Sequence, residues 1–136
     1  MKQKLTTISS KGLILFSALS IALVSAMAFT DPQAVMDLVQ VKLTNTDAYS
    51  SIRGVYGGVG LTIFVTLAYL AFTDHRKGLV FTSLLWGFYA LSRLLTIAME
   101  GSLGAFGNQW LVIESTLFVL SVILLAVQAR QKTALA

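Results

Sequence analysis

The sequence predicts an all-α integral membrane protein, a four-helix bundle forming a single domain of residues 1–136, with a short interfacial helix after the first span. Composition supports this class, because 56% hydrophobic and 12% charged residues differ widely from the roughly 25% charged residues of soluble domains. Four apolar runs, at residues 12–29, 52–73, 79–99 and 109–129, are each near the length that crosses a bilayer. Most basic residues lie at the ends of these runs, as topology signals do.

The first run, 12–29, follows three lysines and carries no charge. Two interpretations stay open. The lysines, the apolar stretch and the small residues Ala26-Met27-Ala28 are also typical of a secretory signal peptide cleaved after Ala28, which would leave three spans. We favour a retained helix, because the run is longer than a usual signal-peptide core and gives a consistent charge map.

The segment after the first span contains a helix-start signal, Thr30-Asp31-Pro32, in which a capping residue precedes a proline. A short helix lying in the interface is expected there, with an ordinary loop as the alternative. Residues 42–51 are polar and typical of turns, and Asp47 or Ser50 is a candidate cap for the next helix. The apolar residues at helical spacing in the short helix are Val35, Met36, Leu38 and Val39.

The second span, 52–73, opens with a glycine-rich entrance, Arg53-Gly54-Val55-Tyr56-Gly57-Gly58. Gly54 and Gly58 form a small-xxx-small face on which another helix can approach closely, and Gly57 lies beside it. We therefore predict a helix-packing role for these glycines, with a frayed helix end as the alternative.

The third span, 79–99, follows a predicted five-residue turn at 74–78, so it should run antiparallel to the second. The turn contains His75, which receives no role because a lone loop histidine is usually solvated. Residues at helical spacing from Arg93 should share an inward face. Residues on this face or packing along the span are Trp86, Gly87, Tyr89 and Glu100.

The fourth span, 109–129, follows a predicted loop at 100–109 that contains Gly101, Gly104 and Gly107. With four spans, seven of the basic residues fall at one membrane face and only Lys42 and Arg53 at the other. The positive-inside rule therefore predicts that both termini are cytoplasmic.

Arg93 and Glu114 are opposite charges inside successive apolar runs, each at roughly 8 to 9 Å below the outer boundary at about 1.5 Å per residue. Charges at this depth are costly and usually face a bundle interior in pairs. One hypothesis is an outward-facing polar pocket, and the other is a structural ion pair that holds the helices in register. The candidate ligand-binding residues are Arg53, Tyr56, Tyr89, Arg93, Glu100 and Glu114.

Catalytic chemistry finds little support in this sequence. The chain has no cysteine and one histidine, and it lacks a nucleophilic triad, a metal-ligand cluster and a phosphate-binding loop. We therefore predict no catalytic residues, no metal, no cofactor and no nucleic-acid partner.

The entrance 51–58, followed by helices carrying Arg93 and Glu114, resembles a bacterial inner-membrane family catalogued as domain of unknown function 4345. The resemblance covers residues 12–127 and is more distant to the DoxX-like four-helix proteins. It implies four spans, including the first, and brings no known activity. Some DoxX-like relatives are associated with quinone-linked oxidation, but this chain shows no redox residues. The matching positions are Arg53, Tyr56, Gly57, Gly58, Arg93 and Glu114.

Together these features predict a non-enzymatic inner-membrane protein that acts as an accessory or lipid- or small-amphiphile-binding component. Membrane lipid and a lipid-like or small anionic ligand are the expected partners, and a homo-oligomer or a membrane-complex partner stays open. The first alternative is a small oligomeric transporter that exchanges a proton at Glu114. The second is a component of a quinone-linked membrane enzyme.

Overall fold

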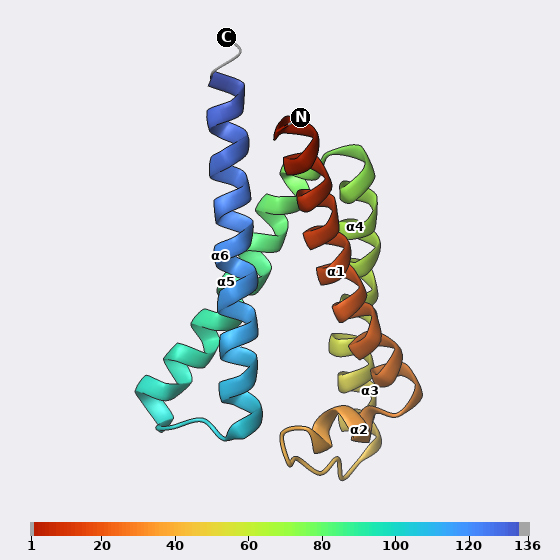
Figure 1. The fold of residues 1–136 in the computed structure, drawn as a ribbon. Coiled ribbons are helices and arrows are strands. Elements are labelled where there is room, and N and C mark those ends of the chain that lie inside the picture. The colour runs from red at the N-terminus through yellow and green to blue at the C-terminus, as the bar shows by residue number, and fades with distance from the viewer. Residues whose placement is uncertain (1, 134–136) are drawn as a thin grey trace. The chain divides into compact units, whose positions relative to one another are not determined.

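The computed structural model describes residues 2–133, and the chain forms two compact units. Unit 1 is Met1–Ile14 with Leu70–Ala136, and unit 2 is Leu15–Tyr69. Four helical segments, Gln3–Thr30, Thr46–Thr73, His75–Glu100 and Ala105–Gln131, are long and apolar enough to span a membrane, so the predicted all-α membrane class is confirmed. The elements in order (Figure 1) are α1 Lys2–Thr30, α2 Pro32–Asp37, α3 Thr46–Ile52, η1 Arg53–Val59, α4 Gly60–Thr73, α5 His75–Glu100 and α6 Ala105–Thr133.

The spanning helices are longer than the apolar runs that predicted them. Helical hydrogen bonding depends on the backbone, so it continues into polar residues beyond each apolar run. The second spanning segment already begins with α3, because Asn45 rather than Asp47 or Ser50 caps it and accepts from the backbone N–H of Ala48 at 2.8 Å. The polar stretch 42–51 is therefore helical from Thr46.

Both turns of unit 1 are tighter than predicted. The predicted five-residue turn at 74–78 is wrong, because only Asp74 separates α4 from α5. The Asp74 side chain caps α5 by accepting a hydrogen bond from the N–H of Lys77 at 3.0 Å. The loop before α6 is confined to Gly101–Gly104, and Gly107 lies inside α6. Gly101 ends α5 with φ 102°, a left-handed conformation that glycine adopts without strain.

The short helix α2 packs onto the end of α1 in unit 2. As predicted, Asp31 caps it, accepting from two backbone N–H groups, and Pro32 occupies the first turn. Val35 and Met36 are buried against Ala28 of α1, which is completely inaccessible. The helix ends at Asp37, earlier than the apolar pattern predicts, and Leu38 and Val39 are exposed beyond it.

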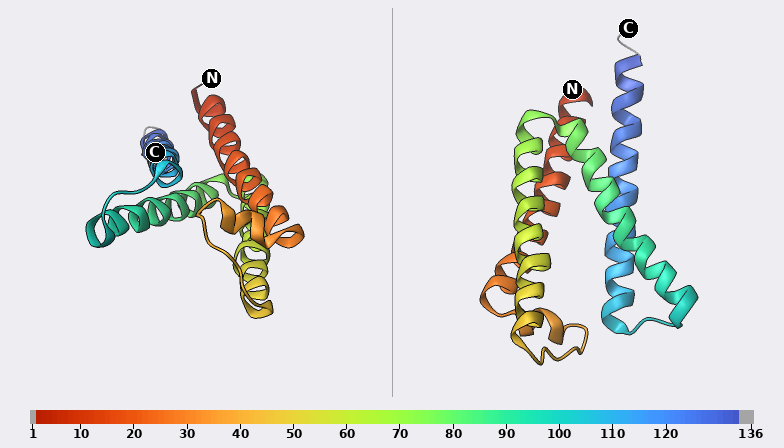
Figure 2. Two further views of the ribbon diagram at one scale, coloured as in Figure 1. Left: turned by 90° about the horizontal axis from the view of Figure 1, so that it is seen from below. Right: turned by 180° about the vertical axis from the view of Figure 1, so that it is seen from behind.

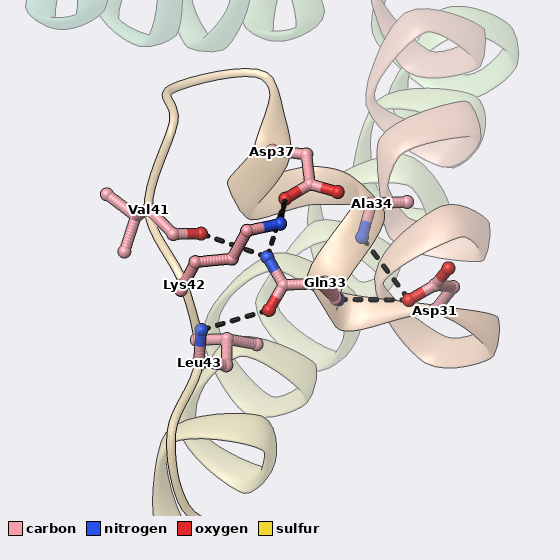
Figure 3. Close-up of polar contacts among 7 residues, drawn as sticks. All are labelled: Asp31, Gln33, Ala34, Asp37, Val41, Lys42 and Leu43. Atoms are coloured by element: carbon pink, nitrogen blue, oxygen red, sulfur yellow. Dashed lines mark hydrogen bonds and ion pairs between the residues drawn. The ribbon is translucent and has the colours of Figure 1, made fainter.

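Gln33 ties α2 to the extended segment that follows it (Figure 3). Its amide nitrogen donates to Asp37 at 2.7 Å and to the carbonyl of Val41 at 2.9 Å, and its amide oxygen accepts from the N–H of Leu43 at 2.9 Å. Lys42 closes the cluster with an ion pair of 2.8 Å to Asp37. Because every polar atom of the Gln33 amide is bonded, this loop has a defined conformation.

The glycine-rich entrance forms a π-helix, η1, where the sequence predicts an ordinary helical entrance. The hydroxyl of Ser25 on α1 donates to the carbonyl of Gly57 at 2.6 Å. A Cβ built at Gly57 would lie 3.1 Å from the ring of Phe29, so the absent side chain allows the close approach of α1. Gly54 and Gly58 face open space, and their packing role stays a prediction.

In unit 1, α5 and α6 lie side by side and diverge towards the Gly101–Gly104 loop (Figure 1, and Figure 2 in two further views). A Cβ built at Gly87 on α5 would lie 3.0 Å from the ring of Phe118 on α6, so the absent side chain lets this ring pack against the α5 backbone. The side chains of α5 buried in this unit include Leu79, Thr82, Ser83, Trp86 and Ala90.

The loop cluster of unit 2 predicts a low pKa for Asp37. The hydrogen bond from Lys42, followed by that from Gln33, lowers the pKa of this carboxyl below its ordinary value. Its contribution to stability is therefore complete above about pH 4, the unfolded pKa, and is lost as the pH falls through the lower folded pKa. NMR titration of the carboxyl carbon in detergent micelles measures this shift.

Lys42→Gln should return the Asp37 pKa towards its ordinary value, because it removes the largest cause of the shift. Lys77→Gln is the matched control, since Lys77 pairs with Asp74 and should leave Asp37 unchanged. An Asp37 pKa that does not respond to Lys42→Gln would contradict the described cluster.

Candidate functional site

Arg93 and Glu114 lie on the faces of α5 and α6 that meet in unit 1. Arg93 follows the buried residues Trp86 and Ala90 of α5 at helical spacing, and Glu114 precedes the buried Leu117 of α6. Nε of Arg93 donates to Oε2 of Glu114 at 2.6 Å, and Nη2 donates to Oε1 at 2.8 Å. The predicted pairing of these two charges is confirmed, in the bidentate geometry that best suits guanidinium and carboxylate.

The two partners are buried to different extents. The side chain of Glu114 is 2% exposed and that of Arg93 is 21% exposed. Among the described residues, no fully buried side-chain nitrogen or oxygen lacks a hydrogen-bond partner. Nη1 of Arg93, which makes no hydrogen bond within the described residues, is therefore not fully buried, so the pair combines a buried carboxylate with one accessible donor nitrogen.

Tyr89 and Glu100 share α5 with Arg93 but make different contacts. The ring of Tyr89 lies 5.9 Å from that of Trp86, measured between centroids, and the residue is 39% exposed. Glu100 is exposed at the end of α5 and, in the part of the chain described, forms no ion pair with Arg93. Of these two residues, Tyr89 is about one helical turn from Arg93 along α5, whereas Glu100 is about two turns away.

Arg53 and Tyr56 belong to unit 2. Nε of Arg53 donates to the carbonyl of Phe29 at 3.2 Å, which links η1 to the end of α1. Tyr56 is 37% exposed. Their convergence with Arg93 and Glu114 stays a prediction.

A polar seam along α6 was not predicted. Gln128 donates to the hydroxyl of Ser10 at 2.9 Å, and Gln131 donates to that of Thr6 at 3.0 Å, which joins the end of α6 to the start of α1. The available signal was the heptad spacing of Glu114, Ser121 and Gln128, which places polar groups on one side of the helix. Ser121 is buried and donates to the carbonyl of Leu117 at 2.7 Å.

The geometry suits hydrogen bonding and charge compensation. No group of three or more His, Cys, Asp or Glu within the described residues could hold a metal ion. The Arg93–Glu114 pair instead neutralises two charges inside a spanning pair of helices and leaves donors available to an acceptor on a ligand.

Comparison with protein families gives one assignment. The family model described as "Domain of unknown function (DUF4345)" matches residues 9–125. The chain therefore belongs to this family, as the motif of the second span and the two intramembrane charges imply. Searches of curated proteins and of solved structures find no match. The comparisons do not show the more distant DoxX-like resemblance.

Breaking the Arg93–Glu114 pair should destabilise the protein more than removing it. Glu114→Leu or Arg93→Met should each lower the free energy of unfolding by about 3 kcal/mol, because each leaves a charge without its partner. The double variant Arg93→Met/Glu114→Leu should recover most of that loss, since no unpaired charge remains. Circular dichroism during unfolding in mixed SDS micelles measures these changes.

Glu100→Leu is the control, because Glu100 is exposed and its replacement should change stability by less than about 0.5 kcal/mol. A double variant whose loss equals the sum of the two single losses would contradict a coupled pair.

Proposed function

We propose that this family member is a non-enzymatic component of a bacterial inner membrane that binds a lipid or small amphiphile through Arg93. One observation carries the proposal: Arg93 is fixed by a bidentate bond to the buried Glu114 and still has an accessible donor nitrogen, Nη1. If the pair served only to join the helices, both side chains should be buried. Here the Glu114 side chain is buried and the Arg93 side chain is partly exposed.

The chemistry of the pair favours a particular class of ligand. Arg93 and Glu114 together carry no net charge, so a headgroup with strong hydrogen-bond acceptors, such as a phosphate, carboxylate or carbonyl, would bind without competing for the carboxylate position. In a site away from water, each such bond is stronger than in solution. Tyr89, exposed about one turn away on α5, would supply an aromatic surface for the apolar part of the ligand.

The outward-facing pocket is the fuller form of this proposal. In it, Glu100 would add a polar group of the same helix to the Arg93 headgroup site. The exposure of Glu100 is compatible with ligand contact.

A transporter using Glu114 receives less support from the same contacts. Both oxygens of Glu114 are hydrogen-bonded to Arg93, so a proton could be exchanged only after the pair opens. Glu114→Gln tests the transporter, because this substitution would abolish pH-dependent transport if Glu114 exchanges the proton. Transport that the variant retains would exclude this alternative. A quinone-linked enzyme would be recognised by redox turnover of the purified protein.

Arg93 should be required for a co-purifying amphiphile. Native mass spectrometry of the protein released from membranes in mild detergent should detect a bound lipid or small amphiphile. In the variant Arg93→Met/Glu114→Leu, no unpaired charge remains. The amount of bound amphiphile should fall about tenfold or more in this variant, because a hydrogen bond to a charged group contributes about 1.5–3 kcal/mol.

Lys42→Gln is the matched control, since it removes an exposed loop cation and should leave the bound ligand unchanged. Unmodified protein that carries no amphiphile, or a double variant that keeps it, would reduce the role of Arg93 to bracing the helices.

We also propose that α1 is retained and that both termini are cytoplasmic. Ala28, the residue before the candidate cleavage site, forms part of the core with Val35 and Met36, so cleavage would remove one side of that core. The excess of basic residues at the start of α1, the α4–α5 turn and the end of α6 supports this orientation.

The orientation can be measured with single cysteines, because the chain contains none of its own. In intact cells, Thr44→Cys should react with a membrane-impermeant maleimide, since the loop would face outward. Arg76→Cys should react only after the membrane is opened. Labelling of Arg76→Cys in intact cells would overturn the proposed orientation. A measured protein mass that is lower than 14.7 kDa by the mass of the first 28 residues would overturn the proposal that α1 is retained.

A further inference from the structure

One end of unit 1 carries a concentration of cations that the Arg93 site does not use. These cations come from three segments: the start of α1, the α4–α5 turn and the end of α6, which meet at the same end of the unit (Figure 1). We call this surface the basic end. Its residues are Lys4, Lys11, Arg76, Lys77 and Arg130.

The three segments of the basic end are joined by specific contacts. Gln128 and Gln131 of α6 bind the hydroxyls of Ser10 and Thr6 on α1, at 2.9 and 3.0 Å. A Cβ built at Gly78 on α5 would lie 2.7 Å from Cδ1 of Ile14, so α1 and α5 approach closely here. The cations therefore stand on segments with fixed relative positions rather than on independent helix ends.

The positive charge of the basic end is largely uncompensated. Asp74 is its one carboxylate among the described residues, and it is engaged with Lys77 through an ion pair of 3.2 Å. The backbone and side-chain hydrogen bonds from Lys77 lower the pKa of Asp74, so this acid stays ionised and occupied. Lys4, Arg76 and Arg130 are exposed and appear in no ion pair within the described residues.

In a bilayer the basic end would lie at the depth of the lipid headgroups, because it is at the ends of helices long enough to span. Its cations flank the apolar runs 12–29, 79–99 and 109–129. Nζ of Lys11 lies 5.8 Å from the ring centroid of Phe72, which is itself exposed, so an aromatic ring supports this cation beside apolar surface. Cations placed just outside a spanning helix attract anionic headgroups.

We propose that the basic end is a binding surface for acidic phospholipids, which it holds through their headgroup phosphates. The hydrogen bonds from Gln128 and Gln131 position the cations so that several of them reach one headgroup layer. This surface is independent of the Arg93 site, because it uses other residues and requires net negative charge in the lipid.

The test compares phosphatidylglycerol with phosphatidylcholine added to the full-length protein in a neutral detergent, with lipid binding followed by native mass spectrometry. The unmodified protein should prefer phosphatidylglycerol, and the preference should fall as salt is added. Arg76→Gln should weaken phosphatidylglycerol binding about fivefold, and Lys4→Gln/Arg76→Gln/Arg130→Gln about a hundredfold. Phosphatidylcholine binding should not change.

Lys42→Gln is the matched control for Arg76→Gln, because both remove one exposed cation but Lys42 lies in unit 2. Equal losses in these two variants, or no preference for phosphatidylglycerol in the unmodified protein, would overturn the proposal. Full competition by inorganic phosphate would also overturn it, since the ligand would then be the free ion rather than the lipid.

The variant Gln128→Leu/Gln131→Leu keeps every charge and removes the hydrogen bonds that join α6 to α1. It should weaken phosphatidylglycerol binding severalfold while its helical circular dichroism is unchanged. Unchanged binding would overturn the positioning role assigned to these glutamines.

Discussion

The bidentate bond between Arg93 and Glu114 is the interaction on which the α5–α6 pair depends. In a bilayer the surrounding chains are as apolar as leucine, so burial of apolar surface gives little preference for one helix rotation over another. A charge at this depth provides that preference, because every arrangement that separates the two groups leaves each of them unsolvated. The rotation of α5 and α6 about their own axes is therefore determined largely by the positions of Arg93 and Glu114.

The remaining contacts of this pair depend on that orientation. Gly87 can receive the ring of Phe118 only when the two helices present these faces to each other. The buried hydroxyls of Thr82 and Ser121 donate to carbonyls of their own helices, so they add no preference for a partner. The Arg93–Glu114 pair and the packing at Gly87 consequently depend on the same orientation of α5 and α6.

The sequence was sufficient to predict the membrane class, four helices of spanning length and the Arg93–Glu114 pair. Charges inside apolar runs are rare, and their depth follows from the helical rise, so this contact could be anticipated. The ends of the helices could not, since Asn45 competes with other polar residues as a cap and its success depends on the folded loop. The hydrogen bonds that Gln128 and Gln131 donate to α1 could not be predicted, because polar residues near a helix end usually contact water.

The π-helix η1 was also beyond sequence reasoning, because its wide turn is supported by a hydroxyl of Ser25 that is distant in the chain. Its presence has a consequence for the whole of α4. Each residue of an α-helix turns the chain by about 100°, so a stretch with more residues per turn resets the angular position of everything downstream. The lipid-facing and protein-facing sides of α4 therefore cannot be obtained by extending a helical wheel from α3. Loss or gain of a single residue between Arg53 and Val59 would rotate those sides by about 100°.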